Sequence, residues 1–149
     1  PVLGSMEFAC RIAGSRLIVV LGHTSCGAIK GACDGVQMGH LSTLLNLIQP
    51  SVYFERSVTE NRTSSNHDFV DKVSRIQVVR GVEGVVERSG VLRSMIEAGE
   101  LGLIGAMYDV NTGSVEFYDE TWMCGSVRHF YTDTAVPKAA GAPAAAAAG

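Results

Sequence analysis

Residues 17–27 read LIVVLGHTSCG and place five apolar residues directly before a turn that carries His23 and Cys26. The first five positions are all apolar, which is the pattern of a strand buried on both faces of a parallel sheet. Ligands of open parallel sheets bind at the carboxyl ends of the strands, which is where this turn lies. The stretch therefore predicts an α/β fold with a binding site directly after the strand.

His23 and Cys26 together make half of a zinc site. Imidazole nitrogen and thiolate sulfur are donors that zinc prefers, and the His-x-x-Cys spacing lets both reach one ion. A helix that begins at Cys26 favours the thiolate over the thiol. We predict His23 and Cys26 as metal ligands, against the alternative of an ordinary core histidine and a structural cysteine. A catalytic zinc needs three protein ligands and a structural zinc four, so at least one more must come from elsewhere.

The remaining cysteines and histidines are not expected to complete the site. A helix over residues 26–33 would place Cys33 about 10.5 Å from Cys26 along its axis. Cys10 is expected near the opposite end of the strand, more than about 15 Å away. Free cysteines are among the most buried residues, so we expect both in the core. Surface or capping roles are expected for the others, which geometry leaves open: His40, His67, Cys124 and His129.

Apolar spacing predicts the other elements of the fold. Helices are expected over residues 1–13, 26–33, 40–48 (ended by Pro50), 67–87 and 89–96, and strands over residues 101–110 and 114–118. Residues 111–113, Asn-Thr-Gly, predict a hairpin turn between the last two strands. We expect one α/β domain over residues 1–120 and an irregular tail rich in Ala, Gly and Pro over residues 121–149.

Composition and charge argue against several classes of function. The chain has 149 residues, 46% of them hydrophobic, which suffices for one core. A net charge of −3 without a basic cluster argues against a nucleic-acid partner. No apolar stretch is long enough to span a membrane. Four irregularly spaced cysteines do not predict a disulfide framework, so we expect a reducing compartment, the cytoplasm, although an upstream signal peptide is left open.

Residues 17–30, LIVVLGHTSCGAIK, closely resemble the second zinc motif of β-class carbonic anhydrases. The similarity spans about residues 2–118 and includes MGHL (38–41), NRTSSN (61–66), SGVL (89–92) and GAMYDVNTGSVEF (105–117). The resemblance implies a mostly parallel sheet flanked by helices, with His23 and Cys26 as two of the family's three protein ligands for Zn²⁺. It also implies reversible hydration of carbon dioxide to bicarbonate, and a homodimer or tetramer when the protein is complete.

One part of the family pattern is absent from this sequence. The third ligand of the family is a cysteine in an upstream Cys-x-Asp-Ser-Arg motif, and no Asp-Ser-Arg occurs here. We therefore expect a chain that is incomplete at its N-terminus, lacks a strand and helices of the family, is inactive as it stands, and contains no catalytic residue. Two alternatives stay open: a degenerate paralogue acting as a non-catalytic subunit or binding module, and a carbon disulfide or carbonyl sulfide hydrolase on the same scaffold.

Overall fold

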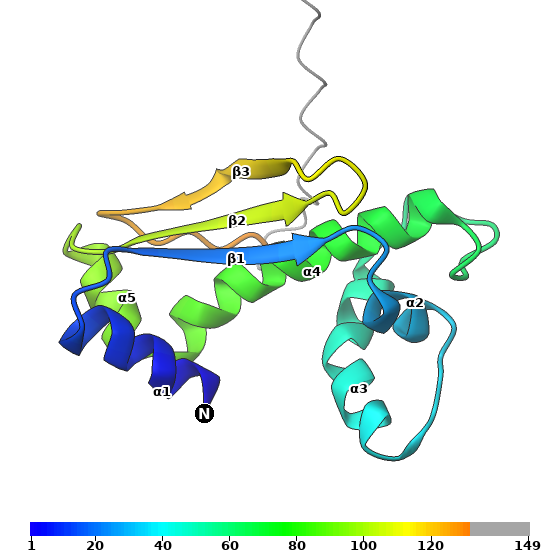
Figure 1. Cartoon of the computed structure of the whole chain (residues 1–149), viewed down its shortest axis with the longest axis horizontal. Coiled ribbons are helices and arrows are strands. Elements are labelled where there is room, and N and C mark those ends of the chain that lie inside the picture. The colour runs from blue at the N-terminus through cyan, green and yellow to red at the C-terminus, as the bar shows by residue number, and fades with distance from the viewer. Residues whose placement is uncertain (132–149) are drawn as a thin grey trace, which may run out of the picture.

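The computed structural model describes residues 1–131, in which a three-stranded sheet lies against a layer of helices (Figure 1). The strands are β1 (Leu17–His23), β2 (Gly102–Tyr108) and β3 (Val115–Met123), in the order β1-β2-β3. β1 and β2 are parallel, whereas β2 and β3 form the predicted antiparallel hairpin. The predicted α/β class is confirmed.

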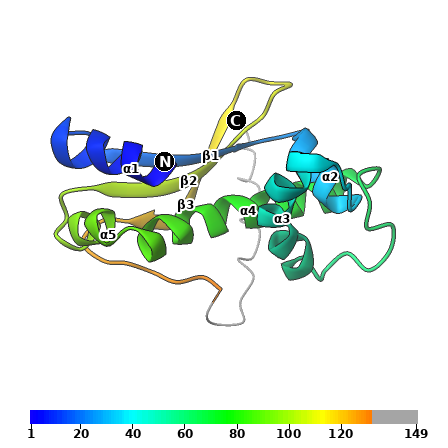
Figure 2. The ribbon, with the colours of Figure 1, turned by 90° about the horizontal axis from the view of Figure 1, so that it is seen from below.

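Helices gather at both ends of the sheet and along one of its faces. They are α1 (Val2–Glu7), which continues as a π-helical turn η1 (Phe8–Ile12), α2 (Gly27–Cys33), α3 (Gly39–Phe54), α4 (His67–Arg88) and α5 (Gly90–Glu97). α1 and α5 lie near one end of the sheet, and α2 and α3 lie near the other, where β1 ends (Figures 1 and 2). In the described part of the chain, no helix combines the length and the apolar character needed to cross a membrane.

α3 continues past the point where the sequence predicts its end. Pro50 lies inside the helix, and the helix runs on to Phe54. Proline removes one intrahelical hydrogen bond and disfavours a helical conformation in the residue before it. Ser51 and Val52 are nevertheless buried, so tertiary packing of this last turn outweighs the local cost of the proline.

α4 is the central helix of the core and packs closely on the sheet. Asn66 caps its start as Oδ1 accepts a hydrogen bond from the Phe69 amide at 3.2 Å. A Cβ atom at Gly22 of β1 would lie 2.5 Å from Val78 Cγ2, and one at Gly81 would lie 2.9 Å from Val20 Cγ1. Glycine at these two positions therefore lets α4 and β1 approach each other more closely than larger residues would allow.

The prediction that β1 is buried on both faces is wrong for the described residues. Leu17, Val19 and Leu21 are 51%, 38% and 55% exposed, whereas Ile18 between them is buried. Successive side chains of a strand point to opposite faces, and the helices lie on one face of the sheet only (Figure 1). β1 is also an edge strand of this sheet, so its second face and outer edge have no cover here. β2, in the middle, is buried from Gly102 to Ala106.

β3 extends beyond the predicted end of the domain at residue 120. It runs to Met123, and Thr121 and Met123 are fully buried. Thr121 Oγ1 accepts a hydrogen bond from the Gly105 amide at 2.8 Å and donates one to the Tyr118 carbonyl at 2.7 Å. The predicted boundary therefore falls inside β3, and residues 132–149 of the predicted tail lie outside the described residues.

Candidate metal site

The turn that links β1 to α2 holds both predicted metal ligands. His23 is the last residue of β1, and Cys26 is the residue that precedes the first turn of α2. Ser25, between them, has φ 57°, a left-handed conformation that costs a non-glycine residue about 1–2 kcal/mol. The Thr24 amide donates to the Tyr108 carbonyl at 2.9 Å, and its hydroxyl oxygen accepts from the Val110 amide at 3.1 Å. Both bonds anchor the strained turn to the end of β2.

The ring of His23 is oriented by its neighbour. His23 Nδ1 lies 2.9 Å from the Thr24 carbonyl oxygen. A carbonyl can only accept a hydrogen bond, so Nδ1 carries the proton and the lone pair of neutral imidazole is on Nε2. Histidines that bind metals are typically held in this way, by a carbonyl or carboxylate on the other ring nitrogen. The imidazole is exposed, and its Nε2 is therefore available to a ligand.

Cys26 is half-buried and packs on the core beneath α2. Its carbonyl accepts the Lys30 amide at 3.0 Å and so begins the hydrogen bonding of the helix. Its side chain makes no capping hydrogen bond. The sulfur is thus free to act as a ligand, at a position set by the start of α2.

The other cysteines lie in different places. Cys10 is 4% exposed and belongs to the core, as predicted. Cys33 ends α2 and is partly buried against the core between α2, α3 and α4, also in line with the prediction. Cys124 is exposed, with Sγ 3.6 Å from the Gly99 carbonyl oxygen. None of the three joins His23 and Cys26 in a metal-binding group of three or more within residues 1–131.

The remaining histidines also lie apart from the turn. His40 is exposed in the first turn of α3, and His67 is the first residue of α4. His129 Nδ1 lies 3.9 Å from Glu87 Oε1. No cluster of three His, Cys, Asp or Glu side chains suited to a metal occurs in the part of the chain that the structure describes. All three histidines are exposed, and within residues 1–131 none of them caps α3 or α4, whose N-caps are Met38 and Asn66.

A cavity of about 310 Å³ lies beside Thr24, between α4 and the sheet. Arg75 lines it, 3.5 Å from Glu116 and 3.2 Å from Glu120, with its guanidinium carbon 4.0 Å from the centre of the Tyr118 ring. These contacts pair the arginine with carboxylates and an aromatic face. The cavity thus adjoins the turn but brings it no histidine or cysteine.

A family model described as carbonic anhydrase matches residues 1–115. The chain belongs to the carbonic anhydrase family. It is 30% identical to carbonic anhydrase 2 of Mycobacterium tuberculosis over 123 residues, which are 79% of this chain and 56% of that protein. It is 29% identical over 131 residues to a carbonic anhydrase of Mycolicibacterium smegmatis, covering 85% of this chain and 60% of that protein.

Solved structures of β-carbonic anhydrases share this fold. CafA of Aspergillus fumigatus matches with a TM-score of 0.63 and 26% identity, over 78% of this chain and 54% of that chain. A tetrameric β-carbonic anhydrase of Sordaria macrospora matches with a TM-score of 0.67 and 22% identity. The match covers 79% of this chain and 59% of that chain. The resemblance to the β class and its fold are thus confirmed. The chain spans little more than half the length of these relatives.

Within residues 1–131, the donors at this turn fit zinc in type but fall short in number. Imidazole nitrogen and cysteine sulfur are both typical zinc ligands, and the contact of His23 Nδ1 with the Thr24 carbonyl leaves Nε2 for a metal. A catalytic zinc takes three protein ligands, and the turn supplies two. Sequence reasoning missed the part that Thr24 plays, because the backbone carbonyl that orients His23 could come from any residue type.

Cys33 makes the stability of the chain depend on pH in the alkaline range. Burial, then Asp34, raises the pKa of its thiol from 9.0 to about 11, although Arg62 lowers it. The folded chain keeps this proton where the unfolded chain loses it, so the free energy of unfolding should fall as pH rises from about 9 to about 11. Urea titrations across this range should show a shallower fall for Cys33→Ser. If the free energy of unfolding falls with pH as steeply in Cys33→Ser as in the unchanged chain, the prediction is wrong. The matched control is Cys124→Ser, at an exposed cysteine, which should leave this pH dependence unchanged.

Proposed function

We propose that this carbonic anhydrase chain supplies His23 and Cys26 as two ligands of a zinc ion that serves the reversible hydration of carbon dioxide. The observation that carries the proposal is the contact between His23 Nδ1 and the Thr24 carbonyl, which leaves Nε2 free at the end of β1. Bound zinc supplies a Lewis acid that makes water nucleophilic at neutral pH. Membership of the carbonic anhydrase family supports the choice of reaction.

The two side chains have different tasks in this proposal. His23 would hold the metal through Nε2 while Nδ1–H donates a hydrogen bond to the Thr24 carbonyl, so the ring could not rotate without losing that hydrogen bond. Cys26 has to give up its proton to bind as the thiolate. Metal binding by this pair therefore releases a proton, and the affinity for metal rises with pH.

Two ligands leave the ion under-coordinated, so we propose that the 149-residue chain alone holds zinc weakly and does not hydrate carbon dioxide. The purified chain should contain well below one zinc per molecule by elemental analysis. Its stopped-flow rate of carbon dioxide hydration should equal that of buffer. A chain extended to the length of its relatives should hold about one zinc and be active. One tightly held zinc together with activity in the 149-residue chain would overturn this proposal.

Substrate, assembly and location are further parts of the proposal. We favour carbon dioxide over carbon disulfide or carbonyl sulfide because the relatives are named carbonic anhydrases, and parallel assays with the three substrates decide between them. A homodimer or tetramer fits the uncovered apolar face of β1, and the Sordaria macrospora relative is tetrameric. An extended chain that folds without binding zinc would favour a non-catalytic subunit. The cytoplasmic location stays a prediction.

A further inference from the structure

The position of Cys26 depends on what holds α2. α2 has seven residues, which is too short for a helix to be stable by itself in water. Its Ile29 and Ala32 side chains are buried against α3 and α4, and Cys26 packs on the same group of residues. We call this group the α2 support cluster; its buried members are Ile29, Ala32, Leu45, Ile48, Val52, Phe69, Val70 and Val73.

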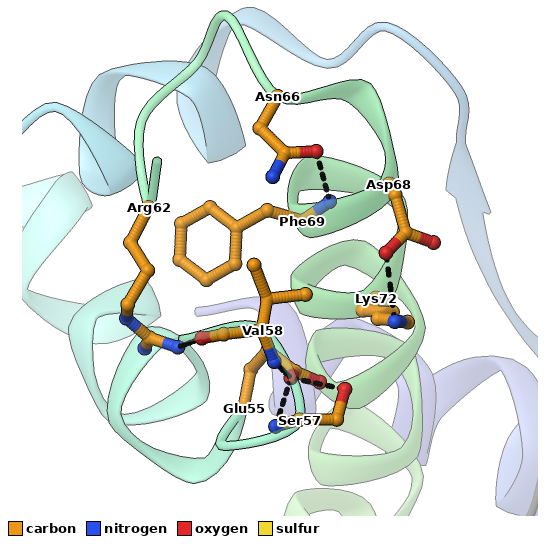
Figure 3. A network of polar contacts seen from close by, with 8 residues as sticks. All are labelled: Glu55, Ser57, Val58, Arg62, Asn66, Asp68, Phe69 and Lys72. Atoms are coloured by element: carbon orange, nitrogen blue, oxygen red, sulfur yellow. Dashed lines mark hydrogen bonds and ion pairs between the residues drawn. The ribbon is translucent and has the colours of Figure 1, made fainter. Parts of the chain in front are cut away.

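Arg62 contacts the α2 support cluster in two ways. Its guanidinium carbon lies 4.5 Å from the centre of the Phe69 ring, which is 0% exposed (Figure 3). Its Nη2 donates to the Val52 carbonyl and its Nη1 to the Val58 carbonyl, both at 2.7 Å. Val52 is in the last turn of α3, where carbonyls lack partners within the helix. Arg62 thus joins the end of α3, the following loop and the first turn of α4.

Glu55 fixes the start of the loop that Arg62 closes. This carboxylate is 3% exposed, and Oε1 accepts hydrogen bonds from the amides of Ser57 and Val58 at 2.6 and 2.9 Å (Figure 3). The Ser57 hydroxyl donates to the same oxygen at 2.6 Å. With its charge satisfied in this way, the buried Glu55 holds the Val58 carbonyl where Arg62 can reach it.

The loop also reaches the far end of α2. Asp34 Oδ1, in the residue that follows α2, accepts a hydrogen bond from the Ser64 amide at 2.7 Å. The charge of Arg62 is close enough to the last residue of α2, Cys33, to affect its thiol. The segment around Arg62 therefore contacts the residue that directly follows α2. Arg62 also supports α2 indirectly, through the ring of Phe69 in the α2 support cluster.

We propose that Arg62 is a positioning residue for the metal site. It holds the α2 support cluster and the loop in place, and α2 in turn sets where the sulfur of Cys26 lies relative to His23. Without the guanidinium, two part-buried carbonyls lose their donor and Phe69 loses its cation. α2 then samples other orientations, and Cys26 leaves its place on the cluster. The identification of Cys26 as a ligand rests on the proposed function, whereas the control of its position by Arg62 does not.

The position of Cys26 can be tested without any metal. We expect Arg62→Ala to raise the alkylation rate of Cys26 in the 149-residue chain about fivefold or more, because local opening exposes the sulfur. Peptide mapping by mass spectrometry follows each cysteine separately. Cys10, buried in the core near the other end of the sheet, reports global unfolding and should keep its rate. The proposal would be overturned if Arg62→Ala left the alkylation rate of Cys26 unchanged, or if it raised the alkylation rates of Cys10 and Cys26 together.

Arg93→Ala is the matched control for this experiment. Arg93 also donates to a backbone carbonyl, that of Val86 at 2.7 Å, but it lies in α5, away from α2. Its replacement should leave the rate of Cys26 unchanged, and equal acceleration by both variants would count against a specific role of Arg62. Arg62→Lys keeps a cation but cannot bridge two carbonyls as the guanidinium does. It should give an intermediate rate, and it decides the question if Arg62→Ala does not fold.

Cobalt titration separates this inference from the proposed function. Co²⁺ bound by Cys26 should give a thiolate charge-transfer absorption in the unchanged chain that is lost in Cys26→Ala. Arg62→Ala should weaken Co²⁺ binding about tenfold, within the range that loss of an orienting partner costs. A spectrum that does not depend on Cys26 would refute the assignment of Cys26 as a ligand. The alkylation rates would still test whether Arg62 controls the position of Cys26. A full-strength spectrum and wild-type affinity in Arg62→Ala would overturn the positioning role.

Discussion

Replacing either His23 or Cys26 by alanine should abolish zinc retention and carbon dioxide hydration in a chain extended to the length of its relatives. Under the proposed function each substitution removes one of the three protein ligands that a catalytic zinc takes, and the loss should exceed the roughly 10–100-fold that removal of an orienting partner costs. Elemental analysis of each purified variant measures the zinc content, and stopped-flow measurement of carbon dioxide hydration measures activity. Both values should fall to the background.

Cys33→Ser is the matched control for this prediction. Cys33 lies at the opposite end of α2 from Cys26, and burial raises the pKa of its thiol, which disfavours the thiolate that zinc binds. The variant should therefore keep its zinc and its activity nearly intact. Full zinc occupancy in Cys26→Ala would reject the ligand assignment, and loss of zinc in Cys33→Ser would show that the wrong cysteine has been assigned.

Phe69→Ala should have the largest effect on stability, a loss of about 3–5 kcal/mol, as is typical for a buried aromatic residue. Phe69 is 0% exposed and joins α4 to α2 and α3 within the α2 support cluster, and its ring also carries the guanidinium of Arg62. The substitution leaves a cavity between three helices that cannot all move to fill it. Urea denaturation followed by circular dichroism measures the change in the free energy of unfolding.

Phe8→Ala makes the same substitution on an exposed side chain. Phe8 is 62% exposed at the start of η1, so the variant should stay within about 0.5 kcal/mol of the unchanged chain. Equal losses for the two variants would show that the α2 support cluster contributes less to stability than its burial indicates. A loss in Phe69→Ala below about 1 kcal/mol would have the same meaning.

Local patterns predicted most of the elements. α4 and α5 begin at residues whose side chains cap them, Asn66 and Ser89, and β2 and β3 meet at the predicted turn. These features depend on spacing and turn chemistry within a few residues, which a sequence displays directly. The prediction for Pro50 was wrong because the burial of the following turn against other helices is invisible in a local pattern.

For the candidate site, the sequence by itself determined the His-x-x-Cys turn at the end of a strand, the likeness to β-carbonic anhydrases and the absence of the family's other zinc motif. These are statements about residue types in order along the chain. They did not include the proton on His23 Nδ1, the strained backbone of Ser25 or the support from Arg62. Each of these depends on backbone geometry or on contacts beyond the motif.

The tertiary structure alone decided which surfaces of the sheet are covered. The apolar residues 17–21 predicted a strand buried on both faces, yet only the face toward α4 is covered in the described chain. It also decided that β3 extends to Met123, because Thr121 and Met123 are buried against segments distant in sequence. The free energy falls when an apolar side chain leaves water, and the sequence shows which side chains are apolar. Which neighbour covers such a side chain is set by the packing of the whole chain.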